Sequence, residues 1–404
     1  MTVPSRIARL AALAGKPSRC IVGLMSGTSL DGLDIALCTV HGAGETTRVE
    51  LERFLTRPYA AAERARLSQV VSRAGAGLKE VCVLNVWLAE VHARGVLAAL
   101  AEWGVAPGQV DALASHGLTV FHAPGAWRLE GEGPETARHA TLQLGDGDAL
   151  AVRTGLLTVS DFRQKEIAGG GQGAPLAPYA EALLYRGAEP RVLLNLGGIA
   201  NFTWLPPRGS PDRPRSGDTG PANTLIDAVA RRTRPAGPGY DPDGAGAARG
   251  KVHAGLLARL KAHPYFAQPC PKSTGPELFG DEYVLRALEA LGAGSIGPDD
   301  LLATLTRLSA ETVADTLRRD VPRLGSATVY VSGGGQRNRT LMRWLAECLP
   351  GVALRPSQDL GAPPDAKEAL LFAVLANELL AGVGFVAADG SERRLAFGKI
   401  SFPD

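Results

Sequence analysis

The chain has 404 residues, enough for two domains or three. Its hydrophobic fraction of 45% and charged fraction of 21% are ordinary for a globular protein. The net charge is only +2, and Lys and Arg are spread along the chain, so a nucleic-acid-binding protein is not indicated.

Five cysteines lie far apart in the chain, which indicates neither a disulfide framework nor a zinc site. Residues 1–19 form a mildly basic N-terminal extension, expected to be disordered or loosely docked. Its apolar stretch is too short for a signal peptide, and we expect no membrane span later in the chain. We therefore expect a cytoplasmic protein that binds neither membrane nor nucleic acid.

The first predicted elements are two strands joined by a turn rich in glycine and hydroxyl residues. The run GLMSGTSLDGLD occupies residues 23–34, between an apolar segment at 20–22 and an alternating one at 33–40. Such a turn offers backbone N–H groups and hydroxyls at close range, which suits a phosphate. It lacks the Gly-Lys-Ser/Thr ending of a Walker loop. An ordinary hairpin turn and a phosphate-binding turn both stay open on this motif alone.

Strand-like and helix-like segments alternate along the rest of the chain, which predicts an α/β architecture. The strand at residues 110–114 is expected to end at Ser115-His116-Gly117. The other predicted strands are 141–144, 156–160, 192–196 and 327–331. The predicted helices are 84–103, 146–153, 175–186, 223–232, 281–291, 299–319 and 365–380.

We place a domain boundary near residues 155–159. This gives an N-terminal domain of residues 20–155 and a C-terminal domain of residues 156–384. Residues 385–404 are expected to pack back on the N-terminal domain.

Three more glycine turns follow or precede apolar segments. Gly197-Gly198 follows the strand at 192–196, and Gly333-Gly334-Gly335 follows the strand at 327–331. A third run, GGGQGAP, occupies residues 169–175. Glycine after a buried strand lets a ligand or another backbone come close. Each turn alone is explained by tight packing, but several together favour a nucleotide-binding protein.

Four polar residues beside these elements are candidates for chemistry or substrate binding. Asp218 precedes a predicted helix, where it could act as a base or cap the helix. Asp161 follows a strand and could instead pair with Arg163. Glu368 sits in an apolar helix and His116 at a strand end, where a surface carboxylate and a buried histidine are the simpler interpretations.

With these residues in view, the chain resembles the anhydro-N-acetylmuramic acid kinase family of bacterial cell-wall recycling. The resemblance runs from about residue 21 nearly to the C-terminus. Its strongest block is residues 23–34. The supporting blocks, all in family order, are 115–117, 142–146, 161–163, 170–176, 195–201, 218–221, 271–275 and 333–335.

The resemblance implies a two-domain α/β ATPase with the actin-like (ribonuclease H-like) fold, closing over a central nucleotide and substrate cleft. It implies a Mg²⁺-dependent reaction of ATP with a 1,6-anhydro sugar. Water opens the anhydro bridge at the anomeric carbon, and the released O6 takes the γ-phosphate, giving N-acetylmuramic acid 6-phosphate and ADP. The partners are then the sugar and ATP; a homodimer and the protein ligands of the metal stay open.

The resemblance also implies roles for individual residues. Asp218 is the base that activates water, and four residues belong to the substrate site: Ser26, His116, Arg163 and Glu368. The nucleotide is assigned to the turns at Gly197-Gly198 and Gly333-Gly334-Gly335 and to the first turn, Gly27, Thr28, Ser29, Leu30, Asp31, Gly32, Leu33 and Asp34.

The chain departs from the family pattern at several positions. Leu118 stands where the family has Gln, Glu166 where it has Asp, and Pro276 where it has Arg. Met25 occupies the place of an Asp that indirectly contacts the metal in the broader superfamily. Two other functions are weighed beside this one: another sugar or acyl kinase of the superfamily, and a non-enzymatic nucleotide-driven clamp.

Overall fold

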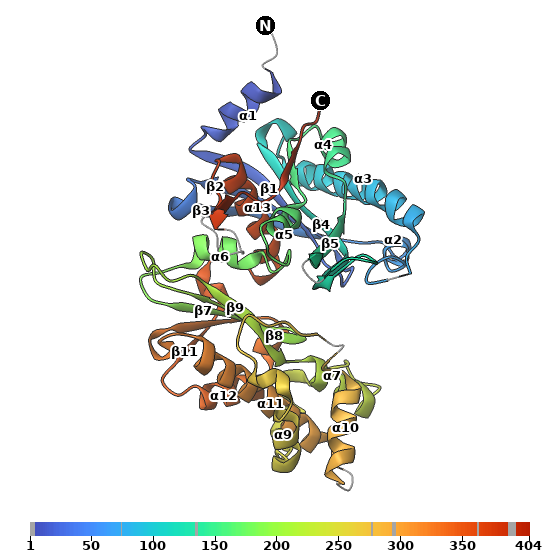
Figure 1. Cartoon of the computed structure of the whole chain (residues 1–404), viewed down its shortest axis with the longest axis vertical. Coiled ribbons are helices and arrows are strands. Elements are labelled where there is room, and N and C mark those ends of the chain that lie inside the picture. Colours follow the sequence, from blue (N-terminus) through green and yellow to red (C-terminus); the bar gives the residue numbers. More distant parts are fainter. Residues whose placement is uncertain are drawn as a thin grey trace. The chain divides into compact units, whose positions relative to one another are not determined.

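The computed structural model divides the chain into two compact units (Figure 1). Unit 1 consists of Met1–Leu184 with Asp365–Asp404, and unit 2 is the continuous segment Tyr185–Pro364. The structure describes residues 5–73, 75–133, 136–275, 278–292, 296–361, 363–386 and 393–404.

Unit 1 is built on a seven-stranded sheet with the order β14-β6-β4-β1-β2-β3, in which β5 pairs with β4 outside this path. Strands β1, β2 and β3 form an antiparallel meander, whereas β4 and β6 run parallel to β1. The strands of the sheet are β1 (Ser18–Ser26), β2 (Gly32–His41), β3 (Arg48–Pro58), β4 (Ala112–Trp127), β5 (Arg138–Leu144), β6 (Thr158–Ser160) and β14 (Lys399–Ser401).

The remaining elements of unit 1 are helices and a short two-stranded ribbon. The helices are α1 (Arg6–Ala14), α2 (Ala61–Leu67), α3 (Leu78–Trp103), α4 (Gly147–Thr154), α5 (Phe162–Ala168), α6 (Ala177–Tyr185) and α13 (Lys367–Leu380). The ribbon pairs β12 (Phe385–Val386) with β13 (Arg394–Leu395).

Unit 2 has a five-stranded sheet with the order β11-β10-β7-β8-β9. Its strands are β7 (Arg191–Leu196), β8 (Ile199–Leu205), β9 (Arg215–Pro221), β10 (Thr328–Ser332) and β11 (Ala353–Pro356). Its helices are α7 (Thr224–Thr233), α8 (Ala245–Arg249), α9 (Ala254–Lys261), α10 (Asp281–Leu291), α11 (Pro298–Asp320) and α12 (Arg339–Cys348).

Both units repeat one sheet topology. In each, three consecutive strands form an antiparallel meander, a fourth strand pairs with the first in parallel, and a fifth pairs with the fourth in parallel. Thus β3-β2-β1-β4-β6 in unit 1 corresponds to β9-β8-β7-β10-β11 in unit 2. The repetition of this five-stranded order is the actin-like, ribonuclease H-like fold, and the expected fold class is confirmed.

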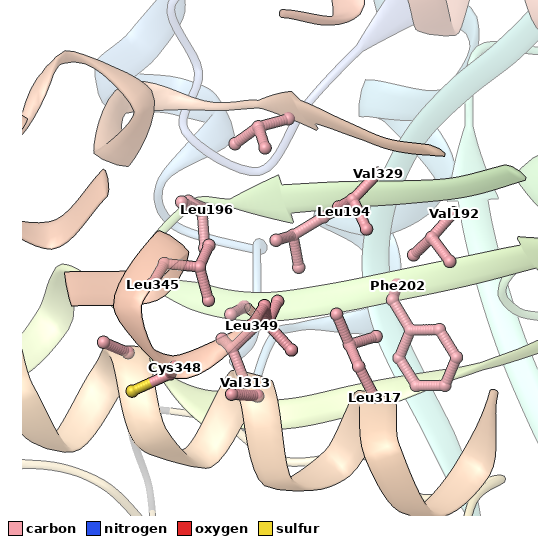
Figure 2. Packing of buried hydrophobic residues seen from close by; sticks show 14 of the residues in the cluster. Val192, Leu194, Leu196, Phe202, Val313, Leu317, Val329, Leu345, Cys348 and Leu349 are labelled. Carbon is pink, nitrogen blue, oxygen red and sulfur yellow. The ribbon is translucent and has the colours of Figure 1, made fainter. Parts of the chain in front are cut away.

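The core of unit 2 lies between its sheet and the helices α11 and α12. Val192, Leu194 and Leu196 alternate along β7 and are completely buried. Figure 2 shows these side chains facing Leu317 of α11 and Leu345 of α12. The alternation is what a strand with one face on helices requires.

In unit 1, α13 lies so close to β1 that no side chain fits between them. A Cβ added to Gly23 would lie 1.9 Å from the carbonyl oxygen of Ala369. Only glycine permits this approach, which seats α13 against β1, β2 and β4. Glu368 and Phe372, on either side of Ala369 in the helix, are thereby fixed relative to the sheet.

The N-terminal extension is docked by a buried arginine. Arg19, the second residue of β1, is 2% exposed. Its guanidinium donates to the carbonyls of Leu13 and Ala14 at the end of α1, and to Asn377 Oδ1 of α13 at 2.9 Å. The described part of the extension is therefore an ordered helix held by unit 1.

The unit boundaries differ from the expected ones at residues 155 and 384. Strand β6 is hydrogen-bonded to β4, and α13 packs on β1, so both elements belong to unit 1. The C-terminal strand β14 pairs with β6, as expected for a chain end that packs back. Strand β4 does not end at residues 115–117 but continues to Trp127, because from Leu118 onward it pairs with β5.

Helix α3 is long and apolar enough to cross a membrane by length and composition, although no such segment was expected. In unit 1 it packs along α4, β2, β3 and β5 through one buried face that includes Leu88, Ala93 and Val96. A helix with these contacts is a core helix of the unit.

Replacing Arg19 by Met should lower the free energy of unfolding of unit 1 by about 2–3 kcal/mol, because charge-assisted hydrogen bonds to buried acceptors are lost. The free energy of unfolding of unit 1 is measured by urea titration, with hydrogen exchange of peptides from β1 and α13 recorded at each urea concentration. Arg6→Met is the matched control: within the described part of the chain the Arg6 side chain forms an exposed ion pair with Asp404, and its loss should change stability by less than about 0.5 kcal/mol. Equal losses in both variants would contradict the docking role.

Candidate active site

The turn between β1 and β2 presents its hydroxyl residues to solvent. Thr28 and Ser29 are exposed, whereas Leu30 is buried in an apolar cluster and adopts a φ of 59°. The Leu30 N–H donates to the Gly27 carbonyl at 3.1 Å, which closes the turn. The two hydroxyls and nearby backbone N–H groups therefore form the accessible tip of a hairpin whose base is buried.

Ser26, expected in the substrate site, lies behind this turn. Its side chain is 1% exposed, and its hydroxyl contacts Tyr59 OH at 2.8 Å. The structure therefore places Ser26 at the base of the turn, below the exposed tip.

Asp34 lies at the mouth of the hairpin, opposite Met25 in the β1–β2 register. Its Oδ1 accepts a hydrogen bond from Thr56 Oγ1 at 2.5 Å. Partial burial raises the pKa of Asp34, the Thr56 hydrogen bond opposes this, and the negative charges of Asp31 and Asp365 raise it further. A carboxylate is thus available beside the position where Met25 replaces the superfamily Asp.

His116 accepts a hydrogen bond from Arg163, and the other contact of its ring determines which group is the donor. His116 is 3% exposed, and its Nδ1 donates to the Gly117 carbonyl at 2.9 Å. Its Nε2 therefore carries the lone pair and accepts from Arg163 Nε at 2.9 Å. The described residues give Arg163 no other hydrogen bond, so both of its terminal Nη groups are available to a ligand.

Phe372 of α13 packs against His116 and Phe162. Its ring lies 4.6 Å from that of His116 and 5.2 Å from that of Phe162, measured between centroids. The imidazole is therefore held by a tilted ring contact as well as by hydrogen bonds, which limits the movement of its partner Arg163.

Glu368 is open to solvent, yet its electrostatic surroundings are unusual for a surface carboxylate. Desolvation by the surrounding protein raises its pKa, Asp34 and Glu181 add to the effect, and Lys367 and Arg163 oppose it. Lys367 in turn contacts the buried Glu181 at 2.6 Å. Glu368 therefore shares one electrostatic environment with Arg163 and Asp34, the other candidates of unit 1.

Two further acidic residues of this region have structural partners. Asp161 pairs with Lys399 of β14 and not with Arg163. Glu166 is 7% exposed and accepts from the Gly173 N–H, so it supports the glycine run at residues 169–175. Burial raises the pKa of Glu166, and the hydrogen bonds from Gly173 and Tyr179 oppose this.

Leu118, which replaces the family Gln, is completely buried. It packs in the cluster that contains Leu30 and Leu144, so it stabilises the base of the turn. The departure at Pro276 lies outside the described residues.

In unit 2 the two predicted glycine turns lie side by side. A Cβ added to Gly333 would come within 2.7 Å of the Leu196 carbonyl oxygen, directly before Gly197-Gly198. The Asn223 side-chain amide donates to the carbonyls of Leu196 and Gly197 at 2.9 and 2.6 Å. Strand ends β7 and β10 thus meet at one glycine-rich edge of the sheet.

Asp218 lies within β9 and is not a helix cap, since Asn223 holds that position before α7. Its backbone N–H donates to the Lys272 carbonyl at 2.9 Å, and its Oδ2 accepts from the Thr274 N–H at 2.8 Å. The Tyr265 hydroxyl donates to the Asp218 carbonyl at 3.0 Å. The carboxylate is therefore held in a defined orientation by the segment around residue 272.

Sequence reasoning assigned no role to several residues that support these candidates. Lys272 and Thr274 lie in a recognised block, 271–275, but the block alone does not indicate that they contact Asp218. Tyr59 and His92, which support Ser26, carry no local signal because their contacts are made across the sheet. Among the described residues, no group of three or more His, Cys, Asp or Glu side chains is arranged to hold a metal.

Comparison with known proteins gives matches over nearly the whole chain. The family model described as anhydro-N-acetylmuramic acid kinase matches residues 19–402. The chain is 44% identical over 396 residues to the protein of that name from Pseudoalteromonas atlantica, covering 97% of each. It is 42% identical over 398 residues to the one from Salinibacter ruber, covering 98% of this chain and 99% of the relative.

Solved structures match with lower similarity. Component A of (R)-2-hydroxyglutaryl-CoA dehydratase from Acidaminococcus fermentans has a TM-score of 0.41 at 12% identity, over 91% of this chain and 100% of that one. A hexokinase from Schistosoma mansoni complexed with glucose has a TM-score of 0.34 at 12% identity, over 88% and 85%.

The two buried histidines of unit 1 should make its stability depend on pH. Burial lowers the pKa of His116 and of His92 to about 3, whereas the pKa of a histidine in the unfolded chain is about 6.5. Between these values the unfolded state binds more protons, so stability falls as pH drops below about 6.5. We expect each histidine to contribute a slope of about 1.4 kcal/mol per pH unit.

Hydrogen exchange of β1 peptides between pH 7 and 5, corrected for intrinsic exchange rates, measures this slope. The variant His92→Gln should show a slope smaller by about one proton. An unchanged slope in that variant would mean that His92 is not buried in its neutral form.

Proposed function

This chain belongs to the anhydro-N-acetylmuramic acid kinase family, and we propose that it uses ATP to open and phosphorylate 1,6-anhydro-N-acetylmuramic acid. Water attacks the anomeric carbon, the bond between that carbon and O6 breaks, and O6 takes the γ-phosphoryl group. The products are N-acetylmuramic acid 6-phosphate and ADP. We also propose that this step serves peptidoglycan recycling in the cytoplasm.

One observation supports this chemistry: the Asp218 carboxylate is held in place in unit 2. Its Oδ2 accepts a hydrogen bond from the Thr274 N–H, and the backbone N–H of Asp218 donates to the Lys272 carbonyl. A general base must hold one orientation toward the water whose proton it removes. We assign that role to Asp218, which takes the proton as the water oxygen bonds to the anomeric carbon. Tyr265 and Lys272 keep its strand in place.

We assign sugar binding to Arg163 and Glu368. The lactyl group of the substrate ends in a carboxylate, which matches the fork of a guanidinium. Arg163 offers its Nη groups for this contact because His116 occupies only Nε. Glu368 accepts hydrogen bonds from sugar hydroxyl or amide groups. His116 acts by positioning Arg163.

We assign the ATP phosphates to the turn after β1. Thr28 and Ser29 supply hydroxyl donors at its exposed tip, and residues 27–34 supply backbone N–H groups. We separately assign nucleotide contacts to the paired glycine turns of unit 2 at Gly197-Gly198 and Gly333-Gly334-Gly335, because their missing side chains allow close approach.

ATP in kinases is bound with Mg²⁺, which prefers oxygen ligands and usually keeps several waters. Asp34 fits this ion: it is a partly buried carboxylate at the hairpin mouth, and the charges of Asp31 and Asp365 make its surroundings negative. When bound, the ion neutralises charge on the transferred phosphoryl group. Asp34 would hold it, directly or through water.

Asp218→Asn should retain the fold and ATP binding but lose turnover by about 10²–10⁴-fold, because the general base is removed. Formation of the 6-phosphate is followed by mass spectrometry. Asp212→Asn is the matched control, since Asp212 lies on an exposed loop of unit 2 with a local Ser210 contact. Turnover near wild type in folded Asp218→Asn would exclude this role. In labelled water, an unlabelled oxygen at C1 of the product would exclude water attack.

Thr28→Val should raise the apparent KM for ATP more than that for the sugar, by about 10- to 100-fold, because one hydrogen bond to a charged group is lost. Steady-state kinetics with each substrate varied separately measure the two constants. Thr46→Val, an exposed threonine with a local Ala43 contact, serves as the control. Equal changes in both constants would argue against a phosphate contact.

A further inference from the structure

A buried chain of hydrogen bonds lies behind the first turn and has no part in the proposed reaction. The Tyr59 hydroxyl lies 2.8 Å from Ser26 Oγ and 2.7 Å from His92 Nε2. The three residues are 4%, 1% and 1% exposed, respectively. Ser26 ends β1, Tyr59 directly follows β3, and His92 lies in the middle of α3. The chain of hydrogen bonds therefore connects the core helix of unit 1 to the turn.

The direction of the hydrogen bonds follows from His92. The burial that lowers its pKa keeps the ring neutral, so one ring nitrogen carries a proton and the other a lone pair. Nδ1 has no partner among the described residues. An orphaned buried N–H is rarer than an under-satisfied acceptor, which places the proton on Nε2. His92 therefore donates to Tyr59, Tyr59 donates to Ser26, and the Ser26 hydroxyl ends the chain.

Tyr59 also holds the far end of the same turn. Its backbone N–H donates to the Asp31 carbonyl at 3.2 Å, while its hydroxyl contacts Ser26. The two bonds lie on either side of residues 27–30. Its ring packs in the cluster that contains Leu30, the buried residue of the turn. One residue therefore contacts the start, the middle and the end of the turn.

We propose that Tyr59, supported by His92, is the positioning residue of the phosphate-binding turn. It holds Ser26 and Asp31 at the separation that exposes the N–H groups and hydroxyls of the turn to one anion. A turn ordered before binding loses less conformational freedom when the phosphates arrive. The inference rests on the proposed role of this turn in binding ATP, and it adds two residues that touch neither substrate.

Tyr59→Phe tests the inference, because it removes the hydroxyl and keeps the ring and the backbone bond. We expect the apparent KM for ATP to rise about five- to tenfold, with kcat and the KM for sugar within about twofold of wild type. Hydrogen exchange of peptides covering residues 24–34 should accelerate in the absence of nucleotide. Tyr283→Phe is the matched control: it removes a hydroxyl that donates to the Leu260 carbonyl in unit 2.

His92 provides the second arm of the test. His92→Leu should reproduce the KM change of Tyr59→Phe, because the Tyr59 oxygen loses its donor. His92→Gln should restore most of the wild-type KM, since the glutamine amide can place an N–H near the position of Nε2. A purely structural role would not predict this rescue together with an unchanged kcat.

The outcomes separate this inference from the proposed function. Wild-type exchange and KM in Tyr59→Phe, or equal effects in Tyr283→Phe, would overturn the inference. If Tyr59→Phe accelerates exchange of the turn but neither it nor Thr28→Val weakens ATP binding, the positioning role stands and the assignment of ATP to this turn fails. If Thr28→Val weakens ATP binding and Tyr59→Phe changes neither the exchange rate nor the KM, the assignment of ATP to this turn stands and the positioning role of Tyr59 fails.

Discussion

The candidate site of unit 1 depends on the contact between Gly23 of β1 and Ala369 of α13. Because position 23 carries no side chain, the helix backbone comes within reach of the strand backbone. Glu368 then lies over the same sheet that carries the β1–β2 turn, and Phe372 packs against His116. A larger residue at position 23 would move the helix and, with it, the Glu368 carboxylate and the Phe372 ring.

The repeated topology explains why candidate site residues lie at turns in both units. In each unit the first strand of the meander ends in a glycine turn, β1–β2 in one and β7–β8 in the other. The two turns are nevertheless supported differently. Side chains of Tyr59 and Leu30 hold the first from the core of unit 1, whereas the second is held by the Asn223 side-chain amide, which donates to its backbone carbonyls, and by the close approach of Gly333. The same architecture thus yields a hydroxyl-bearing turn and a bare one.

The sequence predicted the elements well where periodicity or glycine signals were local. The first hairpin and the strand β7 with its glycine turn form where expected, and helix α3 ends at Trp103 as predicted but begins at Leu78 and not at residue 84. The unit boundaries were wrong because they depend on pairing between distant segments, β6 with β4 and β14, which no local pattern reveals. The same limit applies to the site: Arg163 and Glu368 could be named from their motifs. The contacts of Tyr59 and His92 could not, because three elements bring them together.

Unit 2 is one continuous segment, whereas unit 1 is completed only by residues after Asp365. During synthesis on the ribosome, β1 and α3 emerge early but lack α13, the partner of Gly23 and Arg19, until the last tenth of the chain. Unit 2 has all of its own strands before that point. The unit that begins first is therefore finished last, and a chain released early, without α13, carries neither Glu368 nor the helix that covers its first sheet.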